Sequence, residues 1–467
     1  MPLRGNQLMA GITAACGMGF LLFGYDQGVM GGVIGSPSFV EQFNHPTNEA
    51  LQQGLITGLY DLGCLIGSIA SFVFAERIGR RKSIYIGAGI VTIGTILQVT
   101  AKTTSHLIVG RIVTGCGVGI NTAIIPTWQA EVSPTHQRGI LITVDAALII
   151  AGLAIANWVA FGASYATSSF QWQFPIALQV VFSLDLLLTV PFLVESPRWT
   201  AHHRSLEEAT TLITRLYDVS ETDSIVIKTR DEIAKALEEE RGGEWWEIFR
   251  NGEQQNLRRM LLGFGVLCMQ QLSGINSIGY YLPVILTEYV GLSPTLSHIL
   301  SSIAAVQFFL FALLPIWFIE RVGRRTCMIW GALAQMMAMI FVAVGFNLPR
   351  GGPILITVMF FLFYDACALS YVPVPWMYAP EINNLKMRSK GGAIASASNW
   401  LFNGIVVTVT PSGLANIGWR YYLIWIVLNA SFVPIVYFLY PETKGLSLEE
   451  IDHIFEGKRG WTQGVRV

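Results

Sequence analysis

The chain has 467 residues; 52% of them are hydrophobic and only 13% are charged. Soluble domains average about 25% charged residues, so this composition excludes an ordinary water-soluble protein. The net charge of −1 gives no sign of a nucleic-acid partner, and the six cysteines stand apart from one another, which indicates neither disulfides nor a metal cluster. We expect a membrane protein that uses no cofactor and no metal.

Apolar runs of about 20 residues, the length at which an α-helix crosses about 30 Å of hydrocarbon, recur from one end of the chain to the other. Twelve such runs predict an all-α membrane protein with twelve transmembrane helices. The first run is longer than the core of a signal peptide and has no small-residue cleavage site, so we expect it to be retained. The expected spans, in chain order, are 8–33, 51–75, 84–101, 106–129, 140–163, 174–194, 260–289, 296–319, 328–347, 353–378, 393–411 and 419–440.

Positive charge is unevenly divided between the two sides of these spans. Of the 30 Lys and Arg residues, only Lys102, Arg350 and Arg420 fall in the loops of one side, and only Arg111 lies well inside a span. Cytoplasmic loops retain positive charge, so the asymmetry predicts that both termini are cytoplasmic.

A polar segment separates the first six spans from the last six. The chain is therefore expected to consist of an N-terminal six-helix bundle (1–194), a cytoplasmic helical linker (195–257), a C-terminal six-helix bundle (258–440) and a cytoplasmic tail (441–467).

Internal similarity supports this division. ERIGRRKS (Glu76–Ser83) follows the second span and ERVGRRTC (Glu320–Cys327) follows the eighth, so the same turn recurs at the same place in each half. Parallel repeats of six spans, with substrate held between them near the midplane, are the architecture of one large transporter class. In the linker, apolar residues at helical spacing in 205–218 and 224–240 predict two surface helices.

Eight short motifs match the sugar-porter branch of the major facilitator superfamily in order and register. The chain resembles most closely its fungal sugar/proton symporters, over essentially its whole length. The resemblance implies the major facilitator fold, a small-molecule sugar substrate, and function as a monomer in the lipid bilayer of the plasma membrane. The motifs are FGYDQGV in the first span, the two GRR turns, GRIVTGCGVG, EVSPTHQRG, ESPRW, QQLSGIN, VPVPW and PETKG.

The GCGVG sequence inside the fourth span does not indicate a nucleotide site. It lacks the strand, the full glycine spacing and the acidic residue of a dinucleotide-binding loop. Small residues in a membrane span instead allow close helix packing.

Amide side chains on the seventh span are candidates for binding a sugar. Gln270 and Gln271 lie near the midplane, and Asn276 and Tyr280 lie further out. An amide offers donors and an acceptor, which suits a neutral polyol, and Gly274 allows the helix to break at the depth where transporters build their sites. The alternative is that these amides only join neighbouring helices.

The tenth and eleventh spans add three more candidates. Trp376 follows two prolines, and an indole can cover the apolar face of a sugar ring while its N–H binds a hydroxyl. It could also be an interfacial aromatic anchor, and the resemblance favours the site. Asn399 and Asn403 share one helical face, where similar porters bind the sugar with an amide.

Some positions depart from the sugar-porter pattern. Ala146 stands where many porters carry a glutamine, Gly279 replaces a frequent aromatic residue, and Gln307 and Phe308 stand about where an asparagine is common. These changes would reshape the pocket, so the expectation that the substrate is an ordinary hexose is weaker here than for the family as a whole.

The carboxylate of Asp26 lies within an apolar span, where a charge costs about 2.5–3.5 kcal/mol even on lenient scales. Arg111 on the fourth span lies at the same depth in the outer half of the bundle. An arginine keeps its proton, whereas a carboxyl in a partly dry site can be tuned across a useful pH range. Proton-coupled sugar porters carry Asp at this position, which predicts symport. A permanent ion pair that only fixes the two helices is the alternative.

Four further carboxyls fall in or near the spans. Asp61, Asp185 and Asp365 lie near mid-depth without an obvious base, so they could be neutral, bonded to hydroxyls or part of the proton path. Asp145 lies close to the cytoplasmic end and is expected to be hydrated.

By resemblance, charged residues at the cytoplasmic ends form a salt-bridge network that acts as a gate. Glutamates beside both GRR turns suggest pairs between the halves, which together favour the outward-open state. Exposed pairs contribute only about 0–1 kcal/mol each, which suits a gate that must open. The alternative is a tight glycine turn with arginines anchored at headgroups. The expected gate residues are Arg80, Arg81, Glu131, Arg138, Glu195 and Arg198 in the first half and Glu320, Arg324, Arg325, Glu381 and Arg388 in the second.

The sequence therefore predicts a transporter that imports a sugar, with a monosaccharide as the first expectation, by proton symport and alternating access. An uncoupled facilitator would use the same pocket, and a non-transporting sensor would need a cytoplasmic output, for which the tail 441–467 is short. Neither a nucleophile–base set nor a metal-ligand cluster indicates an enzyme. Pentose, hexose, disaccharide, inositol and quinate-like acids all remain open, although Arg111 as the single base within the spans makes an acid less favourable.

Overall fold

The computed structural model describes the chain with some short gaps. The gaps are residues 1–2, 44–48, 134–137, 241–248, 250, 253, 385–386, 447 and 457–467. For a second set the structure describes the backbone but not the side chains: residues 138–140, 142, 236, 239–240, 389 and 448–449.

The first half consists of five long helices and a sixth span made of two consecutive helices. A short helix, α2 (Pro37–Phe43), lies in the loop after the first span, and a 3₁₀ turn (Val190–Phe192) ends the sixth. The spanning helices are α1 (Gly5–Val33), α3 (Glu49–Ile78), α4 (Arg80–Val99), α5 (Thr104–Val132), α6 (Arg138–Ala163), α7 (Phe170–Ala177) and α8 (Gln179–Thr189).

Three helices form the linker: α9 (Pro197–His203), α10 (Leu206–Tyr217) and α11 (Ser224–Glu240). The last two coincide with the amphipathic stretches of the sequence. Ser205 caps α10 by accepting a hydrogen bond from the backbone N–H of Glu208, as expected for a serine before a helix with acidic residues in its first turn.

The second half contains more interrupted helices than the first. A π-helical turn (Ile285–Tyr289) ends its first span, a 3₁₀ turn (Gly418–Arg420) joins its last two spans, and α21 (Leu448–Phe455) follows them. The spanning helices are α12 (Asn256–Leu272), α13 (Ile275–Val284), α14 (Pro294–Leu313), α15 (Pro315–Val322), α16 (Arg324–Gly345), α17 (Gly352–Leu369), α18 (Val374–Ile382), α19 (Arg388–Ile417) and α20 (Tyr421–Leu439).

The helices confirm the predicted fold class. In the described residues, eleven segments are long and apolar enough to cross a membrane. The last of them, Lys390–Leu439, has 50 residues and contains both α19 and α20, so it supplies the eleventh and twelfth expected spans. The breaks also have local causes: Gly274 adopts φ +96° between α12 and α13, a conformation that glycine adopts without strain.

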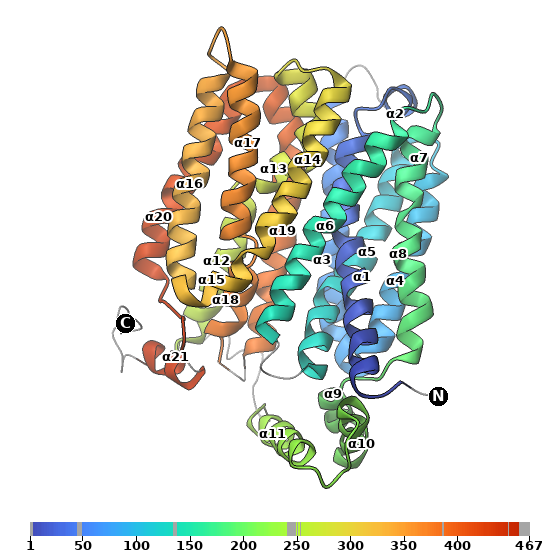
Figure 1. Cartoon of the computed structure of the whole chain (residues 1–467), viewed down its shortest axis with the longest axis vertical. Helices are drawn as coiled ribbons and strands as arrows, with labels where there is room; N and C mark the ends of the chain where they lie inside the picture. Colours follow the sequence, from blue (N-terminus) through green and yellow to red (C-terminus); the bar gives the residue numbers. More distant parts are fainter. Residues whose placement is uncertain are drawn as a thin grey trace.

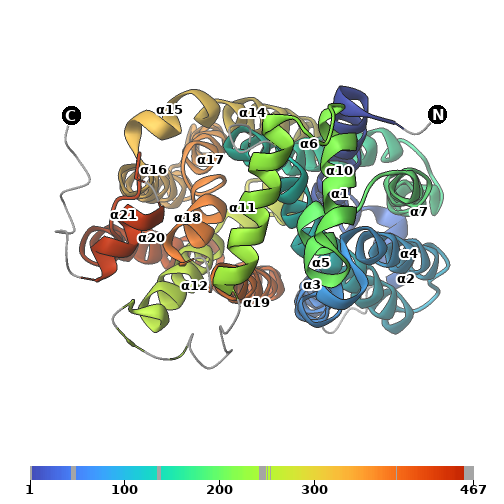
Figure 2. The ribbon, with the colours of Figure 1, turned by 90° about the horizontal axis from the view of Figure 1, so that it is seen from below.

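The two halves lie side by side, and the linker helices lie beyond one end of the bundle (Figure 1). We call this end the linker end and the opposite one the far end. The start of α1 and α21 lie at the linker end, where α10 packs against α1 and α9 against α5. Seen from below, α10 and α11 cross this end of the molecule (Figure 2).

The halves meet mainly where α1 packs against α13, α3 against α19, and α6 against α14, and α6 also touches α15. Glycines make two of these contacts close. A Cβ atom on Gly31 would lie 2.2 Å from the carbonyl oxygen of Tyr280, and one on Gly54 would lie 2.2 Å from that of Thr408. Both glycines lie toward the far end of their helices, so the halves are tightly closed there.

Candidate functional site

A buried ion pair joins α1 and α5. Arg111 Nη1 donates a hydrogen bond to Asp26 Oδ1 at 3.1 Å, and both side chains are fully buried. The guanidinium carbon lies 4.3 Å from the centre of the Tyr60 ring on α3, a cation–π contact. Small residues permit this arrangement, because a Cβ on Gly115 of α5 would lie 2.2 Å from the carbonyl oxygen of Tyr60.

Arg111 is only partly satisfied by these contacts. Its Nε and Nη2 atoms have no hydrogen-bond partner among the described residues. A buried donor without a partner is costly, so these two N–H groups can readily engage another acceptor if one moves within reach. The guanidinium therefore makes one hydrogen bond and a cation–π contact among the described residues.

Four of the predicted substrate-binding amides form a continuous chain of hydrogen bonds. Asn276 donates to Gln271 at 2.6 Å and to Asn403 at 2.7 Å, and Gln271 donates to Asn399 at 2.6 Å. The break at Gly274 places α12 and α13 at different angles, which lets Gln271 and Asn276 meet the same face of α19. We call this set the amide chain.

The amide chain continues into the first half. Asn403 donates to Asp61 Oδ1 at 2.9 Å, and both side chains are fully buried. Asp61 comes from α3, so a single hydrogen bond connects the predicted sugar-binding amides to the half that carries Asp26 and Arg111.

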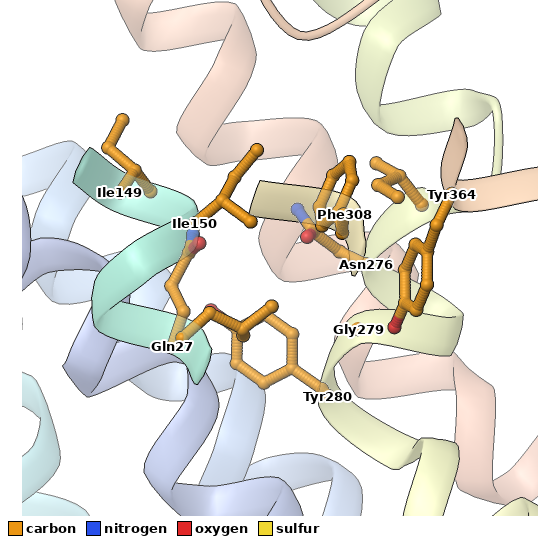
Figure 3. Close-up of a pocket in the computed structure, with 10 residues that line it drawn as sticks. Gln27, Ile149, Ile150, Asn276, Gly279, Tyr280, Phe308 and Tyr364 are labelled. Atoms are coloured by element: carbon orange, nitrogen blue, oxygen red, sulfur yellow. The ribbon is translucent and has the colours of Figure 1, made fainter. Parts of the chain in front are cut away.

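A pocket opens between the halves next to this chain (Figure 3). Asn276 and Tyr280 line it, together with Gly279 and Phe308, two positions at which the sequence departs from the sugar-porter pattern. The other lining residues are Gln27, Ile149, Ile150 and Leu153 from the first half and Ile275 and Tyr364 from the second. An apolar pocket with a few convergent polar groups is the usual form of a small-molecule site.

Two predicted substrate-binding residues lie apart from this arrangement. Gln270 is buried, and its Oε1 has no hydrogen-bond partner among the described residues. Trp376 is half-buried on α18 and packs against the core of the second half. Neither belongs to the pocket lining or to the amide chain in this conformation.

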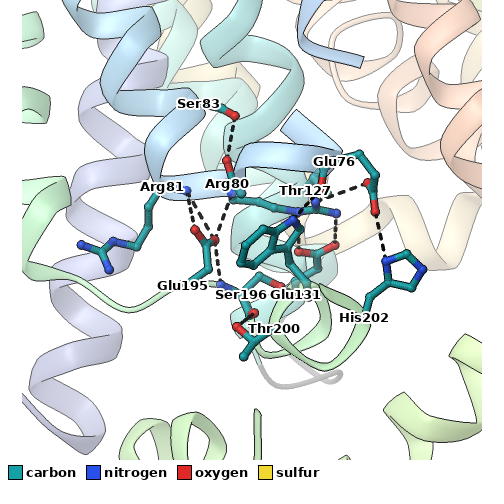
Figure 4. Close-up of polar contacts among 12 residues, drawn as sticks. Glu76, Arg80, Arg81, Ser83, Thr127, Glu131, Glu195, Ser196, Thr200 and His202 are labelled. Carbon is teal, nitrogen blue, oxygen red and sulfur yellow. Dashed lines mark hydrogen bonds and ion pairs between the residues drawn. The ribbon is translucent and has the colours of Figure 1, made fainter. Parts of the chain in front are cut away.

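At the linker end, four predicted gate residues of the first half lie together in a cluster: Arg80, Arg81, Glu131 and Glu195 (Figure 4). Arg80 donates two hydrogen bonds to Glu131, both at 3.0 Å, and lies 3.4 Å from Glu76. Glu195 accepts hydrogen bonds from the backbone N–H groups of Arg80 and Arg81. A carboxylate at a helix N-terminus satisfies N–H groups that have no partner within the helix.

The second half repeats the cluster with equivalent parts. Arg324 bonds Glu320 at 2.7 Å and Glu381 at 2.9 Å, and Glu442 accepts hydrogen bonds from the backbone N–H groups of Arg324 and Arg325. The hydrogen bonds from Arg324 lower the pKa of Glu320. The turns themselves match, with Gly79 at φ +95° and Gly323 at φ +96°.

These contacts correct two expectations about the gate. The pairs made by Arg80 and Arg324 join residues of the same half, whereas the sequence suggested pairs between halves. The arginines of these pairs are shielded, since the side chains of Arg80 and Arg324 are 11% and 5% exposed. Two of their partners, Glu76 and Glu320, remain exposed. The glycine turns explain both results, because each brings an arginine back against glutamates of its own bundle.

Of the remaining predicted gate residues, Arg81 bonds the carbonyl oxygens at Val190 and Pro191, and Arg325 bonds that of Tyr437. Arg198 and Arg388 are half-buried at the linker end. The side chain of Arg138 lies outside the described residues.

The other carboxyls in the spans differ in their surroundings. Gln307 donates to Asp365 at 2.7 Å, and Asp185 is half-buried on α8. Asp145 is buried, not hydrated as expected, because it packs against α5; with its amide nitrogen turned toward the carboxylate, Gln129 donates to it at 2.6 Å.

Sequence reasoning did not single out two residues at these sites, Gln27 and Glu442, and it named Asp61 without identifying its partner. Gln27 follows Asp26 in the chain and lines the pocket, Asp61 ends the amide chain, and Glu442 caps α16. The internal repeat offered a signal for Glu442, since PETKG follows the twelfth span as ESPRW follows the sixth. The other two depend on how α1 and α3 are rotated, which the sequence does not reveal.

Comparison with known proteins shows which family this chain is similar to. The family described as sugar (and other) transporter matches residues 11–455. The MFS-type transporter oryC of Aspergillus oryzae is 38% identical over 97% of this chain and 86% of its own length, and the sugar transporter STL1 of Saccharomyces cerevisiae is 36% identical over 98% of this chain and 84% of its own. The structure of the proton:xylose symporter XylE from E. coli bound to 6-bromo-6-deoxy-D-glucose matches with a TM-score of 0.83 at 24% identity, over 96% of this chain and 99% of that one. The chain therefore belongs to the sugar transporter family of the major facilitator superfamily, and it is a multi-pass membrane transporter, not an enzyme.

Proposed function

We propose that this protein imports a sugar together with a proton, by alternating access, through the plasma membrane. The linker end would face the cytoplasm, in keeping with the distribution of Lys and Arg along the chain. The observation that carries the proposal is the buried pair of Asp26 and Arg111 beside a polar pocket between the halves.

The coupling argument rests on what a buried pair can do. Desolvation offsets much of the attraction in a buried salt bridge, so such a pair is a poor device for stability alone. Ionisable residues inside a membrane domain instead mark ion and proton paths. Protonation of Asp26 would remove the charge opposite Arg111, release the guanidinium for other acceptors and shift the equilibrium between conformations.

The proposed substrate site combines the amide chain with the pocket lined by Asn276 and Tyr280. A sugar hydroxyl can take the place of either amide in these hydrogen bonds, because it can donate to an amide oxygen and accept from an amide N–H. The similarity to a protein named as a sugar transporter supports this substrate class. A monosaccharide is our first expectation for the substrate.

In the proposed orientation the tight contacts at Gly31 and Gly54 close the outer side. Transport would then require these contacts to open while the linker end closes. The two gate clusters would act as rigid parts of their own halves during this movement, since the ion pairs of Arg80 and Arg324 lie within a half.

Uptake into cells that express the protein tests the proposal. The probes are labelled D-glucose, D-xylose, D-galactose, maltose and myo-inositol, each with and without a proton uncoupler. Symport predicts accumulation of at least one probe above its external concentration and loss of that accumulation with the uncoupler. Uptake that the uncoupler leaves unchanged would identify a facilitator, and sugar-dependent signalling without uptake would identify a sensor.

A further inference from the structure

We propose that Asp61 is a second carboxyl of the proton-coupling centre, so that Asp26, Arg111 and Asp61 together hold one transported proton, and that Asn403 links this centre to the sugar site. The inference rests on the proposed symport and names the residues that carry its proton. We call these three residues the charge triad.

The triad comes from three helices of the first half, and Asp61 lies where α3 meets α19 of the second half. Asp61 directly follows Tyr60, whose ring lies against the Arg111 guanidinium, and the charges of both Arg111 and Asp26 act on it. Its Oδ2 atom, like Nε and Nη2 of Arg111, has no hydrogen-bond partner among the described residues. Arg111 therefore has two nitrogen donors, and Asp61 one oxygen acceptor, that could form a further hydrogen bond.

Among the described residues, Arg111 and Asp26 are the charged side chains that interact electrostatically with Asp61. The remaining titratable groups there are a thiol and two phenols, which are neutral at about pH 7 at their ordinary values. Titratable side chains with an electrostatic interaction with Asp61 include Asp26 from α1, Cys64 from α3, Arg111 from α5, and Tyr280 and Tyr281 from α13.

Charge counting then assigns the proton. With both carboxyls ionised, the triad has one positive and two negative charges, and a buried carboxylate without a counterion is strongly unfavourable. One bound proton makes the triad neutral. The closed, dry conformation therefore requires that proton, whereas a conformation open to water can hydrate the extra charge and release it.

This requirement is a coupling mechanism. A proton from water on the outer side forms an O–H bond with a carboxylate oxygen of Asp26 or Asp61, and the halves can then close around a neutral centre. After opening to the cytoplasm, the same O–H bond breaks and the proton passes to water there. Arg111 keeps its own protons throughout, and contacts whichever carboxyl is ionised.

The amide chain connects this event to the sugar. Asp61 accepts its hydrogen bond from Asn403, which in turn accepts one from Asn276 at the pocket. A sugar that displaces the Asn276–Asn403 bond changes how Asn403 is held against Asp61. If Asp61 served only to anchor Asn403, an asparagine in its place would serve equally well, because an amide oxygen accepts the same bond.

Asp61→Asn is the test, because it keeps the size and the acceptor for Asn403 and removes the charge. Asp365→Asn is the matched control: it neutralises a carboxyl on α17 that also accepts a hydrogen bond from an amide, that of Gln307 at 2.7 Å. Both variants and wild type are reconstituted in vesicles with a pH difference of one unit and supplied with D-glucose, D-xylose or myo-inositol.

A pH difference of one unit can drive about tenfold accumulation when one proton accompanies each sugar, since both correspond to about 1.4 kcal/mol. We expect wild type and Asp365→Asn to approach this ratio. Asp61→Asn should level at about a onefold ratio while its sugar exchange stays within about twofold of wild type, because its triad is neutral without a proton. Accumulation by Asp61→Asn equal to that of wild type would overturn the proposal.

Infrared spectroscopy gives a second measurement that needs no sugar. At about pH 7, wild type should show the C=O band of a protonated buried carboxyl. The band should be missing in both Asp61→Asn and Asp26→Asn, because the single carboxylate that remains is ionised and balances the charge of Arg111. A band unchanged in Asp61→Asn would contradict the proposal. If wild type does not accumulate any probe, the symport proposal fails, and the infrared band still decides whether Asp61 shares a proton.

Discussion

Replacing Gly54 with alanine should separate the two halves at the far end. The new Cβ would lie 2.2 Å from the carbonyl oxygen of Thr408, whereas ordinary contact begins at 3.4 Å, so α3 and α19 must move apart by about 1 Å. Overpacking of this kind costs about 1–3 kcal/mol, which lowers the ratio of closed to open conformations by about 5- to 150-fold. In the proposed orientation, the protein would then favour an outward-open state.

Labelling of a buried position reports this change. Thr57 lies on α3 one turn from Gly54 and is buried, so a Thr57→Cys variant should react with an external maleimide only when the halves separate. We expect labelling to become about 5- to 150-fold faster in the Gly54→Ala background and uptake to fall. Gly89→Ala is the matched control, since a Cβ there meets nothing within 4 Å. Equal labelling and uptake in the two backgrounds would refute the close contact between α3 and α19.

Three further changes test the site and the gate. Asn276→Ala removes two donors of the amide chain and should raise the KM for sugar about tenfold or more at unchanged membrane abundance. The reason is that each lost hydrogen bond to a buried group costs about 1–3 kcal/mol. An unchanged KM would show that Asn276 does not contact the sugar. Arg324→Gln leaves Glu381 without its cation and should destabilise the protein by about 3–5 kcal/mol, measured as a lower Tm in detergent. Arg325→Gln loses a hydrogen bond at the exposed surface and should lower Tm much less. Equal Tm shifts in the two variants would contradict the burial of Arg324. Gly279→Phe should fill the pocket and abolish uptake without loss of protein, and normal uptake would place the sugar elsewhere.

The sequence predicted the features that depend on local pattern. Apolar runs located the spans, and the repeated GRR turn indicated two equivalent halves. The pairing of Asp26 with Arg111 could also be anticipated, because a carboxylate in an apolar run needs a counterion and a single base was available at its depth. The glycine break before Asn276 followed from the same kind of local reasoning.

Contacts between helices distant in the chain were beyond such reasoning. Asp61 looked isolated because Arg111, which interacts with it electrostatically, lies on another helix and its amide partner lies in the other half. The gate was expected across the halves because the sequence shows which charges exist but not which way a turn directs them. A positive φ at Gly79 and Gly323 returns each arginine to its own bundle.

The central claim is that a buried carboxyl beside Arg111 couples sugar movement to a proton, and accumulation by Asp26→Asn tests it most directly. In vesicles with an imposed proton gradient, we expect wild type to concentrate a transported sugar. Asp26→Asn should equilibrate the same sugar to about a onefold ratio while sugar exchange is retained, because the remaining Asp61 carboxylate then balances the charge of Arg111 without a bound proton. Continued gradient-driven accumulation by Asp26→Asn would contradict the account and place the coupling proton elsewhere.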